Sequence, residues 1–271
     1  RELNIIADVP DLKEWEQLVG RIKDREEIVH IGLVGKYVQL HDAYLSVAEA
    51  MRHAGYELNA HIKIKWIDSE TIKKDTVDNI LSGVDGVIVP GGFGDRGIEG
   101  MVLTAEYARK NDVPYLGICL GMQIAVIEFA RNVAGLKDAN SREFSEKCKY
   151  KVIDFMPGQS EEVGKGGTLR LGAYLCDVVP GTTLHQCYGT LHISERHRHR
   201  YEFSNEYREL LLSKGLTIGG TSPDGRLVET IELTDKSFYV GVQFHPEFKS
   251  RPNRPHPLFK GFIAAALEGQ Q

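Results

Sequence analysis

One corner of the chain, residues 115–123, constrains the possible folds more than any other stretch. An apolar run ends there in Gly-x-Cys-x-Gly, and apolar residues then recur at helical spacing to Val133. This pattern predicts a strand, a tight turn at Cys119 and a helix, with Gly117 and Gly121 allowing the strained backbone that projects the cysteine. In such a turn the positive end of the helix dipole favours the thiolate. The alternative is a buried structural cysteine that follows a core strand.

Strands and helices alternate through the first half of the sequence. Short apolar or alternating runs predict strands, and the stretches between them have helical periodicity. Strands are predicted at 28–35, 60–67, 84–89 and before Cys119, and helices at 43–53, which Gly55 ends, at 77–81 and at 100–111. This alternation indicates an α/β fold with a mainly parallel central sheet, right-handed crossovers and flanking helices.

The second half of the sequence has a different character. Residues 137–167 are polar and are predicted to be irregular. Five short strands are then predicted, with one helix at 205–214; the strands cover residues 168–175, 190–193, 216–220, 226–233 and 238–244. No linker is evident after residue 28, so we expect one domain over 28–271.

Residues 1–27 differ from the domain that follows them. They are charged and weakly amphipathic, with a helix expected to begin near Pro10. We therefore expect a linker, or the tail of a preceding domain. The chain also begins with Arg1 rather than methionine, as expected for a fragment or a processed chain.

Charge and cysteine usage exclude several classes of protein. The net charge of −5 argues against a general nucleic-acid surface. No apolar run approaches the length that crosses a bilayer, and no signal-peptide pattern opens the chain. The cysteines show no CxxC pairing, which argues against a disulfide framework and a metal site and suits a reducing cytosol; they are Cys119, Cys148, Cys176 and Cys187.

A cysteine nucleophile needs a base within hydrogen-bond reach and a third group that orients the base. Among ten histidines, His245 is the best placed, because it ends an apolar strand where open α/β sheets expose functional groups. Pro246 favours an extended backbone at His245. Glu247, two residues on, then lies on the same side and can hold one imidazole nitrogen. The alternative is a surface His-Pro-Glu turn.

Acyl chemistry also needs hydrogen-bond donors for the developing oxyanion. The glycine-rich stretch 90–94 follows a neighbouring predicted strand, so its backbone N–H groups could face Cys119. The N–H of Leu120 would be the second donor by the geometry of an elbow. A plain glycine-rich turn is an equal alternative for 90–94.

A second glycine-containing turn, at residues 32–36, ends in Lys36. It follows a strand but matches neither the dinucleotide fingerprint nor the phosphate-binding P-loop. We therefore expect a structural turn there.

Three motifs together resemble the class I (triad) glutamine amidotransferase domain: residues 90–92, 117–123 and 245–247. Their order and spacing both fit that family, and the resemblance covers nearly the whole chain. It implies a three-layer, flavodoxin-like fold. It also implies a catalytic triad of Cys119, His245 and Glu247.

A narrower resemblance is to the CTP synthase family. The matching segments are 34–37 with 42–44, 90–97, 167–172, 195–202 and 242–247. The resemblance implies that Arg200 binds the carboxylate of substrate glutamine and that Gln123 and Glu143 hold its polar groups. A planar guanidinium suits a carboxylate because both can pair bidentately. Gly92 would contribute a backbone contact and, with Leu120, the oxyanion hole.

This resemblance also implies partners. L-glutamine would be hydrolysed here, and the ammonia would pass to an N-terminal synthetase domain that binds ATP, UTP and Mg²⁺ and converts UTP to CTP. GTP would activate the enzyme near a lid that contains Phe93 and Arg96. The full-length enzyme would be a cytoplasmic homotetramer, and this domain would hold no cofactor or metal of its own.

Two alternatives remain. The chain could be the glutaminase subunit of another synthetase, one for GMP or carbamoyl phosphate, although the basic run at 196–202 and residues 93–97 argue against it. It could also be an inactive regulatory domain of the same fold. The intact set of Cys119, His245 and Glu247 argues against that reading.

Overall fold

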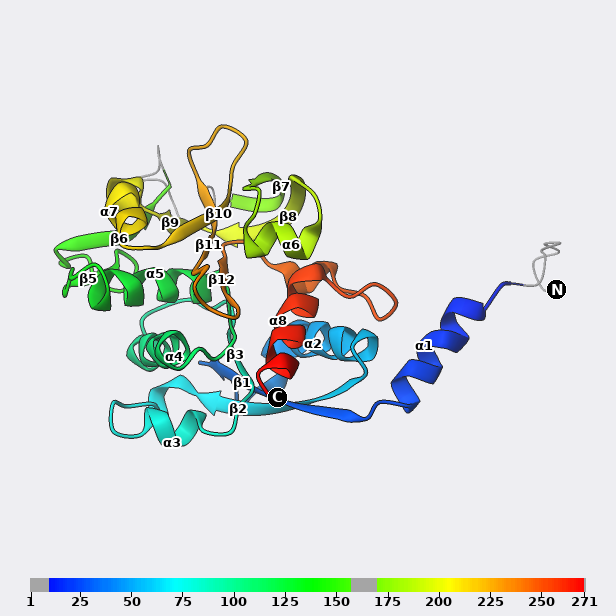
Figure 1. Ribbon diagram of the computed structural model, residues 1–271. Helices are drawn as coiled ribbons and strands as arrows, with labels where there is room; N and C mark the ends of the chain where they lie inside the picture. Colours follow the sequence, from blue (N-terminus) through cyan, green and yellow to red (C-terminus); the bar gives the residue numbers. More distant parts are fainter. Residues whose placement is uncertain (1–9, 157–169, 271) are drawn as a thin grey trace.

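The computed structural model describes residues 10–156 and 170–270. Within them a nine-stranded sheet runs through the molecule in the order β2-β1-β3-β4-β12-β11-β10-β7-β8 (Figure 1). The first five strands of this order are parallel to one another. They are β2 (Ala60–Asp68), β1 (Glu27–Gly35), β3 (Gly86–Val89), β4 (Tyr115–Ile118) and β12 (Tyr239–Val242).

The other four strands extend the sheet in antiparallel fashion, which the sequence pattern did not predict. They are β11 (Val228–Glu232), β10 (Thr217–Thr221), β7 (Arg170–Val178) and β8 (His192–His199). The strand predicted at 190–193 is longer than expected and takes in most of the basic run. Residues 168 and 169 of the strand predicted at 168–175, and the first three residues of the 167–172 motif, lie outside the described residues.

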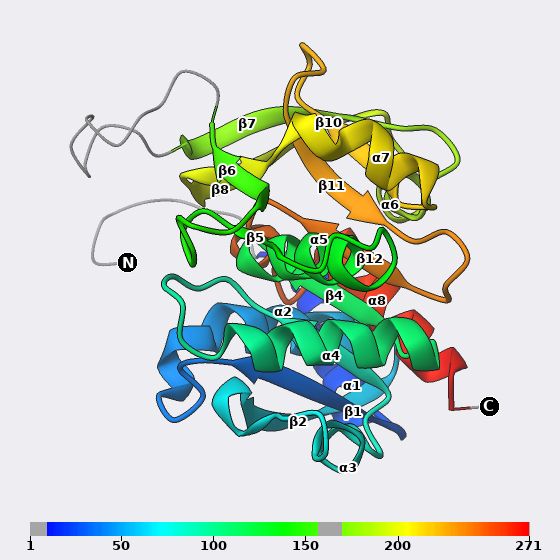
Figure 2. The ribbon, with the colours of Figure 1, turned by 90° about the vertical axis from the view of Figure 1, so that its left-hand side faces the viewer.

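Helices cover both faces of the parallel strands, so the predicted three-layer α/β fold is confirmed. Helices α2 (Leu45–Glu57) and α8 (Pro257–Glu268) lie on one face; α3 (Val77–Leu81), α4 (Ile98–Asn111) and α5 (Leu120–Asn132) lie on the other (Figures 1 and 2). Successive side chains of β3 point to opposite faces of the sheet, so this strand contributes to the hydrophobic core on each face. Val87 and Val89 pack with the α4 and α5 side, whereas Ile88 packs with the α2 and α8 side.

The described part of the stretch predicted to be irregular, residues 137–156, forms part of a second, three-stranded sheet, and residues 157–167 of that stretch lie outside the described residues. Strands β5 (Ala139–Ser141) and β6 (Tyr150–Phe155) pair in parallel, and β9 (Tyr201–Phe203) pairs with β6 in antiparallel fashion. This sheet packs on α5. It therefore brings the residues around 143 and 201 towards the Cys119 corner.

The predicted end of the helix at 43–53 was wrong. Helix α2 runs on to Glu57, and Gly55 lies inside it. A Cβ at Gly55 would be 2.6 Å from the carbonyl oxygen of Ala60. Glycine is therefore used there for close packing of the helix on β2 rather than as a helix stop.

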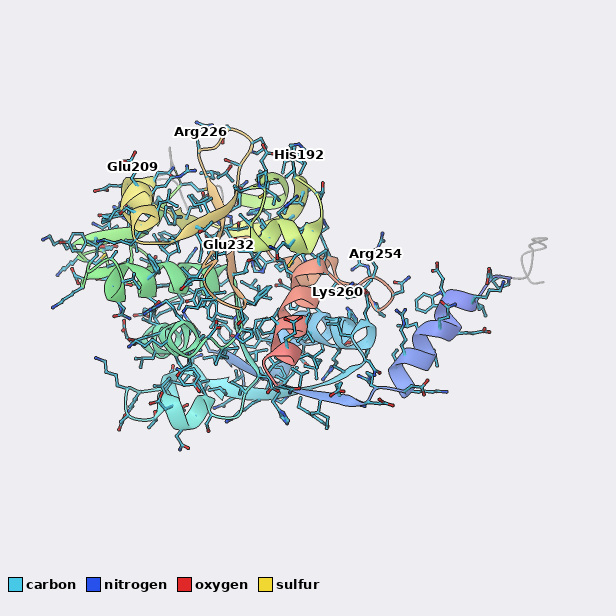
Figure 3. The ribbon with its side chains drawn as sticks, viewed as in Figure 1. His192, Glu209, Arg226, Glu232, Arg254 and Lys260 are labelled. Atoms are coloured by element: carbon cyan, nitrogen blue, oxygen red, sulfur yellow. The ribbon has the colours of Figure 1, made fainter. Side chains whose placement is uncertain are left out.

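Short elements complete the fold. A helix over Arg208–Ser213 (α7) covers most of the helix predicted at 205–214; α6 (Thr183–Tyr188) was not predicted. The α6 N-terminus is capped by the carboxylate of Glu232, which accepts hydrogen bonds from the N–H groups of Thr183 and Leu184 (Figure 3). Single 3₁₀ turns are η1 (His41–Tyr44), η2 (Ser69–Thr71), η3 (Asn205–Tyr207) and η4 (Pro246–Lys249).

Helix α1 (Lys13–Lys23) projects from the rest of the molecule in Figure 1. Leu18 is its one buried residue, and Trp15 and Val19 are exposed. None of the helices in the described ranges has the length and apolar character needed to cross a lipid bilayer.

Candidate active site

Cys119 lies at the corner between β4 and α5, at the carboxyl end of the parallel strands. Its own backbone is strained, with φ of +52° and ψ of −99°. The neighbouring glycines are needed for packing, because a Cβ at Gly121 would be 2.0 Å from the carbonyl oxygen of Val89 and one at Gly117 would be 2.6 Å from Gly121. Close contact between α5 and the strands thus leaves the strain on the cysteine. This corrects the expectation that the glycines adopt the strained conformation.

His245 and Glu247 contact each other as their spacing predicted. Nδ1 of His245 is 2.8 Å from Oε1 of Glu247, and the N–H of His245 donates to the carbonyl oxygen of Arg196 over 2.7 Å. Burial disfavours the protonated imidazole. Hydrogen bonds and charge interactions with Cys119 and Glu247 outweigh burial, and they raise the pKa of His245 to about 10. A protonated imidazole at this position can pass its proton to a leaving group.

The loop after β3 lies against this pair. A Cβ at Gly91 would be 2.9 Å from Cε1 of His245 and 3.7 Å from Cβ of Cys119, and one at Gly92 would be 3.1 Å from a methyl group of Leu120. In the part of the chain that the structure describes, the N–H groups of Gly92 and Leu120 have no acceptor. Both predicted oxyanion donors are therefore unengaged by the described part of the protein, in residues that pack against each other at the Cys119 corner.

A cavity of about 450 Å³ opens beside Cys119 on the side of the small sheet. Four residues that were expected to bind substrate share its wall: Gly92, Gln123, Glu143 and Arg200. The remaining lining residues are Phe93, Cys119, Arg198, His199 and Tyr201. The structure thus brings together, around the thiol, residues from four separate stretches of sequence.

Two of these residues are already engaged with the protein. Nε2 of Gln123 donates to the carbonyl oxygen of Tyr201 over 3.0 Å and to Oε1 of Gln243 over 3.2 Å. Oε1 of Glu143 accepts a hydrogen bond from the N–H of Gly94 over 2.9 Å. These bonds fix both side chains before any ligand enters.

A second cavity, of about 260 Å³, lies on the other side of Cys119. Phe93 and Arg198 line both cavities, and the guanidinium of Arg198 lies 5.8 Å from the ring centre of Phe93. Arg96, which is expected in a lid with Phe93, pairs with Glu70 over 3.1 Å and donates to the carbonyl oxygen of Lys36 over 2.9 Å.

Two residues at the site carry no predicted role. Gln243 lies within a segment that was matched to a family, yet only the neighbouring His245 and Glu247 drew attention. Lys36 was interpreted as part of a structural turn. The local sequence could not have assigned a role to either residue. Each follows a strand that lies beside another strand distant in sequence, β1 beside β3 and β12 beside β4, and this pairing places the residue at the site.

The arrangement can support nucleophilic acyl chemistry. It combines a thiol, a paired imidazole and carboxylate, free backbone donors and a cavity with opposite charges on its wall. Among residues 10–156 and 170–270, no group of three or more metal-binding side chains could hold a metal ion.

Comparison with known proteins points in the same direction. The family model described as glutamine amidotransferase class-I matches residues 39–265. The CTP synthase of Carboxydothermus hydrogenoformans is 62% identical over 268 residues, which are 99% of this chain and 50% of the relative. The CTP synthase of Caldanaerobacter subterraneus is 57% identical over 267 residues, which are 98% of this chain and 50% of that relative. The chain thus spans about half the length of the curated relatives it matches.

A solved structure is similar over the same region. It is the glutaminase domain of Trypanosoma brucei CTPS with bound acivicin, at 39% identity and a TM-score of 0.84, and the match covers 89% of this chain and 94% of that one.

Proposed function

Because the chain belongs to the class I glutamine amidotransferase family, we propose that it hydrolyses the side-chain amide of L-glutamine to glutamate and ammonia. The observation that carries this proposal is the contact of His245 with both Cys119 and Glu247. Cys119 also lines the cavity that holds Glu143 and Arg200, whereas His245 and Glu247 line the second cavity. These are the parts that thiol-dependent amide hydrolysis requires.

In the first half of the reaction, the Cys119 thiolate attacks the amide carbon of glutamine. The carbonyl π electrons move to oxygen, and the N–H groups of Gly92 and Leu120 stabilise the oxyanion. His245 gives its proton to the amide nitrogen as the C–N bond breaks. Ammonia leaves, and the γ-glutamyl group remains as a thioester on Cys119.

In the second half, neutral His245 takes a proton from water as the water attacks the thioester. Glu247 stabilises the imidazolium that forms and holds the ring in place. The C–S bond breaks, glutamate leaves, and the thiolate and imidazolium are restored.

Charge on the cavity wall supports glutamine as the substrate. Arg200 would pair with its α-carboxylate, and Glu143 would accept hydrogen bonds from its α-ammonium group. Gln123 would offer Oε1, since its Nε2 is already used within the protein.

Identity to CTP synthases over the whole chain supports a wider role. In this proposal residues 28–271 are the glutaminase domain of a cytoplasmic CTP synthase, and residues 1–27 connect it to a synthetase domain. That domain would bind ATP, UTP and Mg²⁺ and use the ammonia to convert UTP to CTP. The whole enzyme would be a homotetramer activated by GTP near Phe93 and Arg96.

Active-site labelling tests the central proposal. A glutamine-mimicking electrophile should modify Cys119, located by peptide mass spectrometry, and excess glutamine should slow the modification. Folded protein without label at Cys119 would refute the assignment and favour an inactive regulatory domain.

A variant tests the division of labour in the full-length protein. Cys119→Ala should abolish CTP synthesis with glutamine and leave synthesis with added ammonia intact. Loss of both activities would contradict separate glutaminase and synthetase sites. Glutamine-dependent formation of GMP or carbamoyl phosphate, with no CTP formed, would favour the other synthetases.

A further inference from the structure

Lys36, which follows β1, reaches under the loop that contains Gly92. Its side chain is buried, with 4% of the residue exposed. Nζ donates a hydrogen bond to the carbonyl oxygen of Phe93 over 2.9 Å and a second one to the carbonyl oxygen of Gly94. A buried ammonium group that bonds to carbonyl oxygens fixes those carbonyls more firmly than a neutral donor would.

The peptide group between Phe93 and Gly94 is held at both ends. Its carbonyl oxygen accepts from Lys36, and its N–H donates to Oε1 of Glu143 over 2.9 Å. The two holding groups carry opposite charges and come from separate parts of the fold. This peptide cannot rotate without losing both charged partners.

The loop is fixed again two residues further on. The carbonyl oxygen of Lys36 accepts a hydrogen bond from the guanidinium of Arg96 over 2.9 Å, and the N–H of Lys36 donates to the hydroxyl of Tyr44 over 3.1 Å. Lys36 thus contacts residues 93, 94 and 96 through both its side chain and its backbone. The turn expected at 32–36 therefore also holds the loop that follows β3.

We propose that Lys36 is a positioning residue for the reaction: together with Glu143 it clamps the Phe93–Gly94 peptide and so holds the Gly92 N–H towards the oxyanion. This inference rests on the proposed glutaminase function. The clamp pre-orients a donor that acts on the transition state, so its loss lowers kcat rather than substrate binding.

The electrostatic surroundings give the clamp a pH limit. Burial lowers the pKa of Lys36 to about 8. Four charged groups face the amine: Glu143, Asp95 and Glu70, which raise the pKa, and Arg96, which lowers it. As the pH rises through about 8 the ammonium charge is lost, and the charged hold on the loop weakens.

The test compares Lys36→Met with Lys65→Met in the purified full-length protein. Lys65 is a matched control, because its Nζ also donates to a backbone carbonyl, that of Ile80 over 2.7 Å, but on the surface of the fold. Glutamine hydrolysis gives kcat and KM. Alkylation of Cys119 by iodoacetamide reports the nucleophile alone, since this displacement forms no oxyanion.

For Lys36→Met we expect kcat to fall between ~10-fold and ~100-fold, up to the roughly 100-fold cost of misplacing a group and below the cost of removing an oxyanion donor outright. KM and the alkylation rate should change less than about threefold on the same grounds, and Lys65→Met should match the parent. Unchanged kcat, or an equal fall in alkylation, would overturn the clamp.

A second variant covers the case in which Lys36→Met does not fold. Lys36→Gln keeps a donor but has no charge to lose, so its kcat should be intermediate and should lack the decline near pH 8. A decline identical to that of the parent would overturn the inference. A parent protein that neither hydrolyses glutamine nor accepts the glutamine-mimicking label would instead refute the proposed function itself.

Discussion

The side-chain amide of Gln243 donates a hydrogen bond to the sulfur of Cys119 over 3.5 Å. The same amide accepts from Gln123 through its oxygen over 3.2 Å, and its backbone N–H donates to the carbonyl oxygen of Glu229. Gln243 is fully buried just after β12. A fixed chain of amides therefore links the proposed nucleophile to the wall of the substrate cavity.

Replacing Gln243 by Leu should slow the reaction of Cys119. The sulfur loses a donor that stabilises its negative charge, and such a bond contributes roughly 1.5 kcal/mol, or about tenfold in rate. The measurement is the iodoacetamide alkylation rate at neutral pH. Gln186→Leu, on the exposed face of α6, serves as the control and should react at the parent rate. Equal rates for all three proteins would contradict the role of this amide.

Replacing Gly91 by Ala, which adds one methyl group, should lower glutamine hydrolysis without destabilising the fold. The new Cβ would meet Cε1 of His245 at 2.9 Å, so the imidazole must move. We expect glutamine hydrolysis to fall roughly 100-fold, as for a displaced catalytic group, with the melting temperature nearly unchanged. Gly20→Ala, where a Cβ meets nothing within 4 Å, should leave hydrolysis unaltered. Full activity in Gly91→Ala would show that His245 need not occupy this position.

The ion pair of Arg109 with Glu128 predicts a large effect on stability away from the site. Nε and an Nη of Arg109 bond the two carboxylate oxygens at 2.9 and 2.6 Å, and the Glu128 side chain is wholly buried. Arg109→Met leaves a buried charge unpaired and should lower the free energy of unfolding by about 3 to 5 kcal/mol. Lys110→Met, which removes an exposed pair with Glu106, should cost less than about 1 kcal/mol. Urea denaturation of both variants would reveal whether the two losses differ.

Buried histidines beside the site predict a loss of stability in acid. Burial, followed by the charge of Arg170, lowers the pKa of His197 to about 2 and that of His199 to about 3. Between those values and 6.5 the unfolded chain binds protons that the folded chain does not, so stability rises with pH across this window and falls as the pH drops.

Replacing His197 by Gln should reduce that pH dependence. One of the two protons is no longer taken up on unfolding, so the slope should decrease by about 1.4 kcal/mol per pH unit between pH 4 and 6. His192→Gln removes an exposed histidine (Figure 3) and should leave the slope unchanged. An unaltered slope in His197→Gln would mean that His197 is protonated in the folded protein. Denaturant unfolding at several pH values measures all three slopes.

The sequence predicted those parts of the site that lie within single short segments. The corner at Cys119 and the contact of His245 with Glu247 follow from spacing along one strand and its neighbouring turn. Gln243 and Lys36 could not be found in this way, because nothing near them in sequence shows what they face.

The same distinction applies to the fold. The parallel strands are apolar and carry a clear periodic signal, whereas β5 and β9 have three residues each and include polar side chains. Their pairing depends on β6, which was itself placed in an irregular region. Within β8, buried His197 and His199 break the expected alternation of apolar and polar residues.

The positive φ at Cys119 has a consequence for how the chain can change over time. A backbone held in such a conformation costs roughly 1 to 3 kcal/mol, and glycine at position 119 would relieve most of it. Mutations that relieve the strain at this corner therefore either replace Cys119 or move its thiol away from its present position. Selection for stability alone would drive the chain towards an inert relative, so only continued demand for its chemistry keeps a cysteine there.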